Sequence, residues 1–305
     1  MIFAAILFRI SLSSMYGGIR GHIYVLCLDL WKTFGFKLKK LLSGIFVALV
    51  YSTLSVASAK ACEDLIAGPK GRVIEVVDGD TVVLDSDIRV RLIGIQAPKL
   101  PLGRDGFESW PLALQAKQEL ERLTLDKNVE IRYGGARMDR HGRVLGHMFI
   151  GPERIWAQGA MVREGLARVY SFPDNRFCLS ELYRIEAQAR ADRVGIWNGE
   201  DFYRIRDGSK PQKLLERLDQ YEIVEGRVIN ADRVRQRIYL NFGKNWQEDF
   251  TIVIERAGLR RFEEAGIDPL MFENALIRVR GWVEERDGPR IEVTHPEQIE
   301  LLARP

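Results

Sequence analysis

The residues of this chain that could carry out phosphate or acid–base chemistry are carboxylates and arginines placed at a few turns and strands. Asp80 ends the turn Asp78-Gly79-Asp80, Arg91 lies in an apolar run, and Arg143 follows the turn Asp139-Arg140-His141-Gly142. Taken alone, an aspartate in such a turn is typical of turn chemistry, and a strand arginine is typical of a solvated face. The chain has only four histidines, and no Cys/His spacing indicates a zinc site.

The overall charge does not by itself indicate a protein that binds polyanions. The formal net charge is +3, but residues 60–305 hold 39 basic and 41 acidic side chains, so the excess of positive charge belongs to residues 1–59. Any site for a polyanion must therefore be a local cluster of arginines. A hydrophobic content of 46% with 29% charged residues is typical of globular proteins and excludes disordered, collagen-like and coiled-coil classes.

The N-terminus is predicted to direct the chain out of the cytoplasm. Lysines at 37–40 precede an apolar run at 41–56 and the small residues Ala57-Ser58-Ala59, which is the pattern of a signal peptide cleaved after Ala59. The alternative is an uncleaved membrane anchor at 41–59, which leaves the rest of the chain in the same compartment. Residues 1–36 are either a mis-assigned start or an additional membrane segment. We expect a periplasmic, extracellular or membrane-anchored protein whose only membrane contact is this segment.

The cysteines agree with an oxidising compartment. Cys27 lies in the segment expected to be removed, and Cys62 and Cys178 remain. Two cysteines in an exported chain predict one disulfide, Cys62–Cys178, and the alternative is two unpaired thiols.

Residues 60–198 show the pattern of an OB-type barrel. The expected strands are 71–77, 81–84, 88–95, 128–133 and 144–150, and a helix at 111–125 separates the third from the fourth. Helices at 157–164 and 179–194 follow. Three strands, a helix and two strands are the element order of an OB barrel.

A linker at 199–220, with a short helix at 212–218, leads to a second β-rich block at 221–305. The expected strands are 223–230, 237–242, 250–254, 276–283 and 290–293, with a helical piece at 259–265. The predicted fold is mainly β with helices: an OB-fold barrel followed by a second, smaller OB-like barrel.

Five separated blocks of the first barrel resemble the staphylococcal nuclease (thermonuclease) family, in order and spacing, over about residues 70–198. The blocks are Val77-Asp78-Gly79-Asp80-Thr81, Arg91-Leu92-Ile93-Gly94-Ile95-Gln96-Ala97-Pro98, Asp139-Arg140-His141-Gly142-Arg143, Met161-Val162-Arg163-Glu164-Gly165-Leu166-Ala167-Arg168-Val169, and Glu186-Ala187-Gln188-Ala189-Arg190 with Gly195-Ile196-Trp197. The resemblance implies a barrel of the staphylococcal-nuclease type and a calcium-dependent phosphodiesterase acting on DNA or RNA.

By position, the resemblance assigns roles to three residues. Asp80 matches the first calcium carboxylate, because a hard cation prefers oxygen ligands. Arg91 and Arg143 match the two arginines that bind the phosphate, where charge develops in the transition state. Asp139 lies in the turn of Arg143 and is placed to orient it.

Three departures from the family pattern fall at the centre of the site. Gln96 stands at the second calcium carboxylate and offers only an uncharged amide oxygen, and Ala97 stands where a backbone carbonyl is the ligand. Lys99 stands at the general base, and a lysine is ordinarily protonated at neutral pH and cannot accept a proton. Calcium is the cofactor that the resemblance implies, and Gln96 and Lys99 weaken that expectation.

Three interpretations follow from these departures. Lys99 replaces the charge of the metal in a cation-independent phosphodiesterase. Alternatively, a carboxylate from the loop at 103–108 folds back to act as base or ligand. In the third, catalysis is lost and the barrel only binds nucleic acid. The sequence thus predicts an exported thermonuclease-family protein, a nucleic-acid phosphodiesterase (endonuclease) with an atypical site or else a silent binding module or an envelope interaction protein, and it indicates no protein partner.

The second block carries weaker indications. Aromatic and basic residues alternate around one predicted strand, which is typical both of a single-strand stacking surface and of an ordinary core. They are Arg235, Arg237, Tyr239, Phe242, Lys244 and Trp246.

Overall fold

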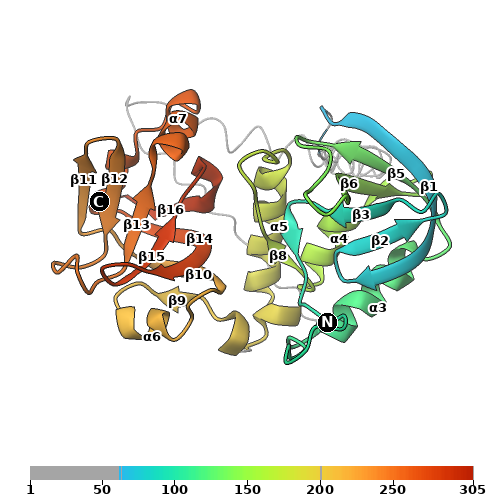
Figure 1. Ribbon diagram of the computed structural model, residues 1–305, viewed down its shortest axis with the longest axis horizontal. Helices are drawn as coiled ribbons and strands as arrows, with labels where there is room; N and C mark the ends of the chain where they lie inside the picture. The colour runs from blue at the N-terminus through green and yellow to red at the C-terminus, as the bar shows by residue number, and fades with distance from the viewer. Residues whose placement is uncertain (1–61, 63, 200, 305) are drawn as a thin grey trace, which may run out of the picture. The chain divides into compact units, whose positions relative to one another are not determined.

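The computed structural model describes residue 62, residues 64–199 and residues 201–304 (Figure 1). The leader or anchor predicted at 1–59 lies outside the described residues, as does Cys27. Within the described residues, no helix is both long enough and apolar enough to cross a bilayer.

The first five main strands close into a barrel. The sheet runs β3-β2-β1-β5-β6-β7, and a further pairing between β3 and β6 joins its ends into a ring of five strands. The strands are β1 (Ile66–Asp78), β2 (Thr81–Leu84), β3 (Arg89–Leu92), β5 (Asn128–Tyr133) and β6 (Val144–Ile150), with the short β7 (Ile155–Trp156) at the edge. The predicted OB-type barrel is therefore confirmed, in a mixed α/β chain.

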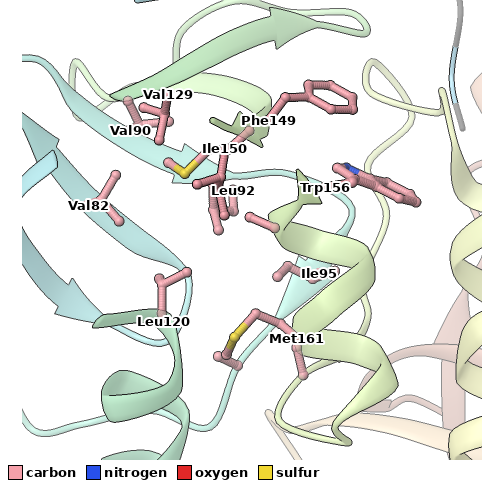
Figure 2. Packing of buried hydrophobic residues seen from close by; sticks show 14 of the residues in the cluster. Val82, Val90, Leu92, Ile95, Leu120, Val129, Phe149, Ile150, Trp156 and Met161 are labelled. Atoms are coloured by element: carbon pink, nitrogen blue, oxygen red, sulfur yellow. The ribbon is translucent and has the colours of Figure 1, made fainter. Parts of the chain in front are cut away.

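Three helices cover the barrel and complete its core. They are α3 (Ala113–Thr124), α4 (Ala157–Arg163) and α5 (Leu179–Ala191). Figure 2 shows Val82, Leu92, Leu120 and Met161 pointing from strands and helices into one interior, where all are buried. α3 begins after the predicted Pro111 because the intervening Leu112 has a φ of 65°, outside the helical region.

The strand predicted at 88–95 is divided by a turn at Gly94. Gly94 has a φ of +79°, and a Cβ there would lie 2.7 Å from Cδ1 of Leu182, so both conformation and space require glycine. After the turn, β4 (Ile95–Gln96) leaves the barrel sheet and pairs with β8 (Arg168–Val169). This change of partner determines where Gln96 points.

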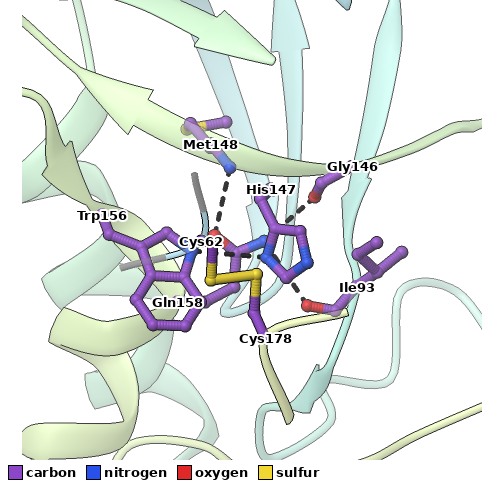
Figure 3. The surroundings of a disulfide bond; sticks show 8 residues. All are labelled: Cys62, Ile93, Gly146, His147, Met148, Trp156, Gln158 and Cys178. Carbon is purple, nitrogen blue, oxygen red and sulfur yellow. Dashed lines mark hydrogen bonds between the residues drawn. A yellow bond between two sulfur atoms is a disulfide. The ribbon is translucent and has the colours of Figure 1, made fainter. Parts of the chain in front are cut away.

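Cys62 and Cys178 are joined by a disulfide across 116 residues, the pairing that the sequence predicts. Figure 3 shows the bond beside His147, Trp156 and Gln158. Gln158 accepts a hydrogen bond from the Met148 N–H (3.1 Å) and donates one to the Gly146 carbonyl (2.9 Å). The disulfide therefore fixes the N-terminal end of the described chain to the start of α5.

The C-terminal strands form one sheet in the order β11-β12-β13-β15-β14-β10-β9, with β16 also on β14. The strands are β9 (Arg206–Asp207), β10 (Tyr221–Arg227), β11 (Asn230–Val234), β12 (Arg237–Asn241), β13 (Thr251–Ile254), β14 (Leu276–Glu285), β15 (Pro289–Glu292) and β16 (Ile299–Ala303). The helices are α6 (Pro211–Leu215) and α7 (Arg256–Glu264), with short 3₁₀ turns η1 (Gly195–Trp197), η2 (Asp201–Tyr203), η3 (Pro269–Phe272) and η4 (Pro296–Gln298).

This second sheet is not closed into a barrel by a strand pairing among the described residues. The strand predicted at 223–230 divides, because the Val228 N–H bonds to Ala275 on one side and the Ile229 N–H bonds to Asn241 on the other. The chain itself, rather than a hydrogen-bonded ladder, connects β10 to β11. The expected element order, with a helix between the third and fourth of its predicted strands, is present.

Buried apolar residues gather in two clusters, one within residues 65–185 and the other within residues 214–299. Both clusters lie in one compact unit. The segment predicted as a linker contains η2, β9 and α6, and β9 pairs with β10. It is thus part of the second sheet rather than a free connector.

Candidate functional site

The site predicted around Asp80 lies where the turn between β1 and β2 meets the segment after β4. Gly79 permits this approach, because a Cβ there would lie 2.6 Å from the Ala97 Cβ and 2.8 Å from the Ala116 Cβ. Asp80 is fully buried, with Arg91 on the adjacent strand β3 and Lys99 three residues beyond β4. The structure therefore brings together three of the predicted site residues.

Asp80 is surrounded by donors and cations. Lys99 Nζ donates to both carboxylate oxygens, at 2.8 and 2.7 Å, and Arg91 Nη2 lies 3.2 Å from Oδ2. The Ala97 N–H also donates to Oδ2, at 2.8 Å. Burial acts to raise the pKa of Asp80, but Arg91, Lys99 and these hydrogen bonds outweigh it and hold the pKa at about 2. At physiological pH Asp80 is therefore an ionised, buried carboxylate whose charge is balanced by Lys99 and Arg91.

Asp78 is the second carboxylate of the site. Its Oδ1 accepts the Asp80 N–H at 3.1 Å, and its Oδ2 lies 3.7 Å from Lys99 Nζ. Burial and the charge of Asp80 raise the pKa of Asp78, and Lys99 and Arg91 oppose the rise. Of the two carboxylates, Asp78 is the one that accepts a proton more readily.

The two arginines of the predicted phosphate clamp differ in accessibility: Arg91 lies on β3, and Arg143 directly precedes β6. β3 and β6 pair in parallel, with Val90 opposite Val144. Arg91 therefore lies one residue after this pair, and Arg143 lies one residue before it. Arg91 donates to the carbonyls of Leu92 and Ile95, and its side chain is 11% exposed. Arg143 is 31% exposed, so it is the arginine that an approaching phosphate can reach.

Asp139 orients Arg143, as the sequence predicts. Its Oδ2 accepts a hydrogen bond from Arg143 Nε at 2.7 Å, and its Oδ1 accepts the backbone N–H of Arg143 at 3.0 Å. Burial acts to raise the pKa of Asp139, but these hydrogen bonds and the charge of Arg143 lower it. Arg143 Nη2 also lies 2.7 Å from Asp139 Oδ2, whereas no hydrogen bond or ion pair joins Nη1 to another described residue.

Gln96 is not presented to Asp80. Its Oε1 accepts hydrogen bonds from Nε and Nη2 of the buried Arg168, at 2.9 and 2.8 Å, and the Arg168 guanidinium lies 5.0 Å from the Tyr221 ring centroid. The sequence contained Arg168 in a family block, but no pattern connected it with Gln96 across 72 residues. Gln96 therefore links β4 and β8 to the C-terminal sheet.

The residues present do not fit a calcium ion. The predicted ligands were Asp80, the Gln96 amide and the Ala97 carbonyl, whereas Asp80 is bonded to an ammonium, Gln96 to Arg168, and Ala97 reaches Asp80 through its N–H. In the part of the chain that the structure describes, no three acidic, histidine or cysteine side chains gather to hold a metal. A cation at Asp80 would have to displace Lys99.

The loop at 103–108 does not supply the missing carboxylate. Asp105 and Glu108 are exposed, and neither side chain makes a hydrogen bond or ion pair with residues 64–199 or 201–304. The loop is held instead by Arg104, which donates to the carbonyls of Pro101 and Leu100 and stacks on Phe107. No carboxylate of this loop therefore replaces the general base at whose position Lys99 stands.

We predict that Asp80 dominates the acid sensitivity of the site. Because its folded-state pKa lies below the ordinary 3.8, ionised Asp80 stabilises the fold above about pH 4, and that contribution of about 2 kcal/mol is lost as the pH falls through about 2. Asp80→Asn is expected to be less stable at pH 7 and to show a flatter decline from pH 4 to 2. Urea unfolding at a series of pH values measures this, and equal acid slopes in both proteins would contradict it.

The aromatic and basic residues of the second block are divided between core and surface. Phe242 is buried against Phe250, with ring centroids 4.8 Å apart. Tyr239, Trp246 and Arg237 line a cavity of about 430 Å³ on the sheet, together with Asp232, Glu255, Asp287, Arg286 and Arg290. Because carboxylates and arginines are balanced there, contact with nucleic acid at this cavity stays a prediction.

The closed five-stranded barrel, with the buried Asp80 paired to Arg91 and Lys99, defines a protein of the nuclease-type OB class. A model described as "Staphylococcal nuclease homologue" matches residues 89–199. "Protein ParB" of Escherichia coli is 32% identical over 163 residues, which span 48% of this chain and 85% of that protein. An "Uncharacterized endonuclease" of Escherichia coli is 32% identical over 140 residues (45% and 82%), and the "Thermonuclease" of Staphylococcus hyicus is 27% identical over 130 residues (42% and 75%).

The chain therefore belongs to the staphylococcal nuclease family, and its relatives include thermonucleases and endonucleases.

Proposed function

We propose that the nuclease-type barrel binds the phosphodiester backbone of DNA or RNA and does not hydrolyse it by the calcium-dependent route of its family. The observation that carries this proposal is the pairing of Lys99 Nζ with both oxygens of Asp80, at 2.8 and 2.7 Å. The ammonium supplies a fixed positive charge beside the aspartate, so the site keeps an attraction for phosphate while the cation position is occupied by protein.

Arg143 and Lys99 are the residues proposed to meet the phosphate. Arg143 can donate through Nη1 while Nε stays bonded to Asp139, and the side chain of Lys99 is 21% exposed. Arg91 is tied to carbonyls and to Asp80, and its proposed role is to hold the site in place. Arginine and lysine donors of this kind bind phosphate without reading the base sequence.

A second candidate function is hydrolysis without a metal ion. Asp78 favours it, because its raised pKa and its position 3.7 Å from Lys99 suit a group that exchanges protons beside a phosphate. The names of the relatives, which include endonucleases, favour turnover as well.

We also propose that the protein is exported, as a periplasmic, extracellular or membrane-anchored molecule. The leader pattern at 37–59 supports this, and so does the disulfide Cys62–Cys178, since disulfides persist mainly in oxidising compartments.

We further propose that the C-terminal sheet is OB-like, and its element order supports this.

Binding and cleavage of labelled single-stranded DNA and RNA test the proposed function. We expect Arg143→Ala to weaken binding about tenfold and to lower the slope of log K against log salt by about 1, because one phosphate contact is lost. Arg140→Ala is the matched control, since Arg140 is exposed in the same turn and contacts only His141. Cleavage is expected to be absent with calcium, magnesium or EDTA.

Each alternative outcome has a defined meaning. Cleavage abolished by EDTA would overturn the proposal and restore the metal mechanism. Cleavage that survives EDTA and is lost in Lys99→Ala would establish the second candidate. Equal binding by the Arg143 and Arg140 variants, with equal melting temperatures, would exclude Arg143 as a phosphate ligand.

A further inference from the structure

A cavity of about 270 Å³ lies between the segment after β8 and the C-terminal sheet, away from Asp80. Its walls are aromatic: Tyr170 and Phe172 come from the N-terminal part, and Tyr221 and Trp282 come from β10 and β14. Phe172 and Trp282 are 44% and 47% exposed, which is unusual for large apolar side chains beside a cavity. The cavity is therefore open to solvent through two aromatic rings.

The rings meet at steep angles, as the walls of a box do. Tyr170 contacts Phe172 and Tyr221 edge-to-face, with centroids 4.9 and 4.5 Å apart, and Tyr221 contacts Trp282 edge-to-face at 6.1 Å. Trp282 Nε1 donates to the Tyr170 hydroxyl at 3.2 Å, which fixes the two rings relative to each other. Rings held in this way line one cavity that opens to solvent.

The charged residues lining the cavity are all acidic. Glu284 and Glu292 contribute carboxylates, and no lysine or arginine of the described chain lines the cavity. Glu284 is bonded to Arg290, at 3.1 and 2.8 Å, whereas the Glu292 side chain has no hydrogen bond or ion pair with a described residue. Burial and the charges of Glu255 and Glu284 raise the pKa of Glu292, and Arg290 and Arg237 oppose the rise.

The cations beside the cavity are engaged by other groups, Arg290 by Glu284 and Arg168 by Gln96. Arg168 lies over one face of Tyr221 but donates to Gln96, outside the lining of the cavity. The aromatic rings and Glu292, which has no ion pair with a described residue, together favour a positively charged ligand that is weakly hydrated. An aromatic box attracts such a cation through the ring quadrupoles, and the attraction is largest when the cation loses little hydration on entering.

We propose that this cavity is a binding site for an organic cation of the quaternary ammonium class. The aromatic rings of Tyr170, Phe172, Tyr221 and Trp282 surround the methylated nitrogen, and Glu292 supplies the countercharge. The site draws residues from both halves of the molecule, so the ligand binds only when the N-terminal barrel and the C-terminal sheet are docked. The proposal is independent of whether the nuclease-type barrel binds or cleaves nucleic acid.

Calorimetric titration of the full-length protein with choline chloride at constant ionic strength tests the proposal. We expect saturable binding that is at least about tenfold tighter than binding of the neutral analogue in which carbon replaces the quaternary nitrogen. The same titration with N-acetyl-lysine methylamide compares a strongly hydrated primary ammonium, which is expected to bind more weakly.

Variants locate the site. Trp282→Ala is expected to lower choline affinity about tenfold, Trp282→Phe to retain most of it, and Glu292→Gln to lower it severalfold. Trp246→Ala is the matched control, because Trp246 is 57% exposed in the turn between β12 and β13, outside the lining of this cavity, and its replacement is expected to leave binding unchanged. Melting temperatures establish that each variant is folded, and Trp282→Phe keeps the test informative if Trp282→Ala is not.

Three results would overturn the proposal. They are an absence of saturable choline binding, equal binding of choline and its neutral analogue, and equal affinities of the Trp282→Ala and Trp246→Ala variants. Tighter binding of the lysine derivative than of choline would overturn the assignment to the quaternary ammonium class.

Discussion

Replacing Arg280 by alanine is expected to lower the free energy of unfolding by about 3–5 kcal/mol, because it leaves a buried carboxylate without its main countercharge. Arg280 on β14 is fully buried, and its guanidinium contacts Glu186 of α5 at 3.0 and 3.2 Å and the Val169 carbonyl at 3.2 Å. It also pairs with Glu300 and lies 4.5 Å from the Tyr183 ring centroid. Denaturant unfolding measures the loss.

Two further variants test whether the loss of stability in Arg280→Ala comes from the buried charge of Glu186 without its main countercharge or from the missing side-chain volume. Arg237→Ala removes a solvent-exposed ion pair with Glu255, and little change in the free energy of unfolding is expected for this variant. The double variant Arg280→Met/Glu186→Gln removes both charges while keeping volume, and it is expected to recover much of the stability. If Arg280→Ala unfolds at the same denaturant concentration as wild type, the docking of the two halves does not depend on this pair.

Replacing Lys99 by glutamate is expected to create a calcium site at Asp80, where the Lys99 ammonium occupies the cation position in the wild type. The substitution exchanges the ammonium on Asp80 for a third carboxylate beside Asp78 and Asp80, and oxygen ligands in such a group suit calcium. Without calcium, the variant is expected to be less stable than wild type because like charges converge. At a calcium concentration one hundred times Kd, binding restores about 3 kcal/mol, which appears as a calcium-dependent rise in melting temperature.

The Lys99→Glu variant also tests the proposed loss of the calcium-dependent route. It places a carboxylate where the family resemblance puts the general base, so calcium-dependent cleavage of DNA is expected to appear in the variant and to be absent from wild type. Lys99→Gln removes the charge without adding a ligand, and neither its melting temperature nor its cleavage should respond to calcium. A calcium response by the glutamine variant, or none by the glutamate variant, would show that Lys99 does not control the cation position.

Gln96 is left unchanged in this design for a structural reason. Its amide oxygen accepts two hydrogen bonds from Arg168, so an aspartate at this position would meet a guanidinium rather than a calcium ion. The position that holds a ligand in the family pattern has become part of the contact between the barrel and the C-terminal sheet.

The sequence alone predicted the elements of the first domain and its closed barrel. It did not predict β9, β11 and β16 of the C-terminal sheet, and the expected second barrel is not closed by a strand pairing among the described residues. Alternating β-branched residues, acidic turns and one amphipathic helix are local patterns, and they predicted the five barrel strands to within a few residues, apart from the early start of β1 and the break at Gly94. The family blocks likewise placed Asp80 beside Arg91 and Asp139 beside Arg143. The cysteine pair followed from count and compartment.

Only the tertiary structure decided how the charged side chains are paired. Lys99 meets Asp80 across 19 residues, Arg168 meets Gln96 across 72, and Arg280 meets Glu186 across 94. Hydrophobic periodicity predicts which face of a helix or strand is buried. It does not predict which charged side chain from a distant part of the sequence is buried against that face. Such partners depend on how the packed elements converge, and burial makes each pairing obligatory once it forms, since an unpaired charge in the interior is too costly to keep. The same convergence of packed elements forms the aromatic cavity, in which Tyr170 and Trp282 are hydrogen-bonded although they are 112 residues apart in the chain.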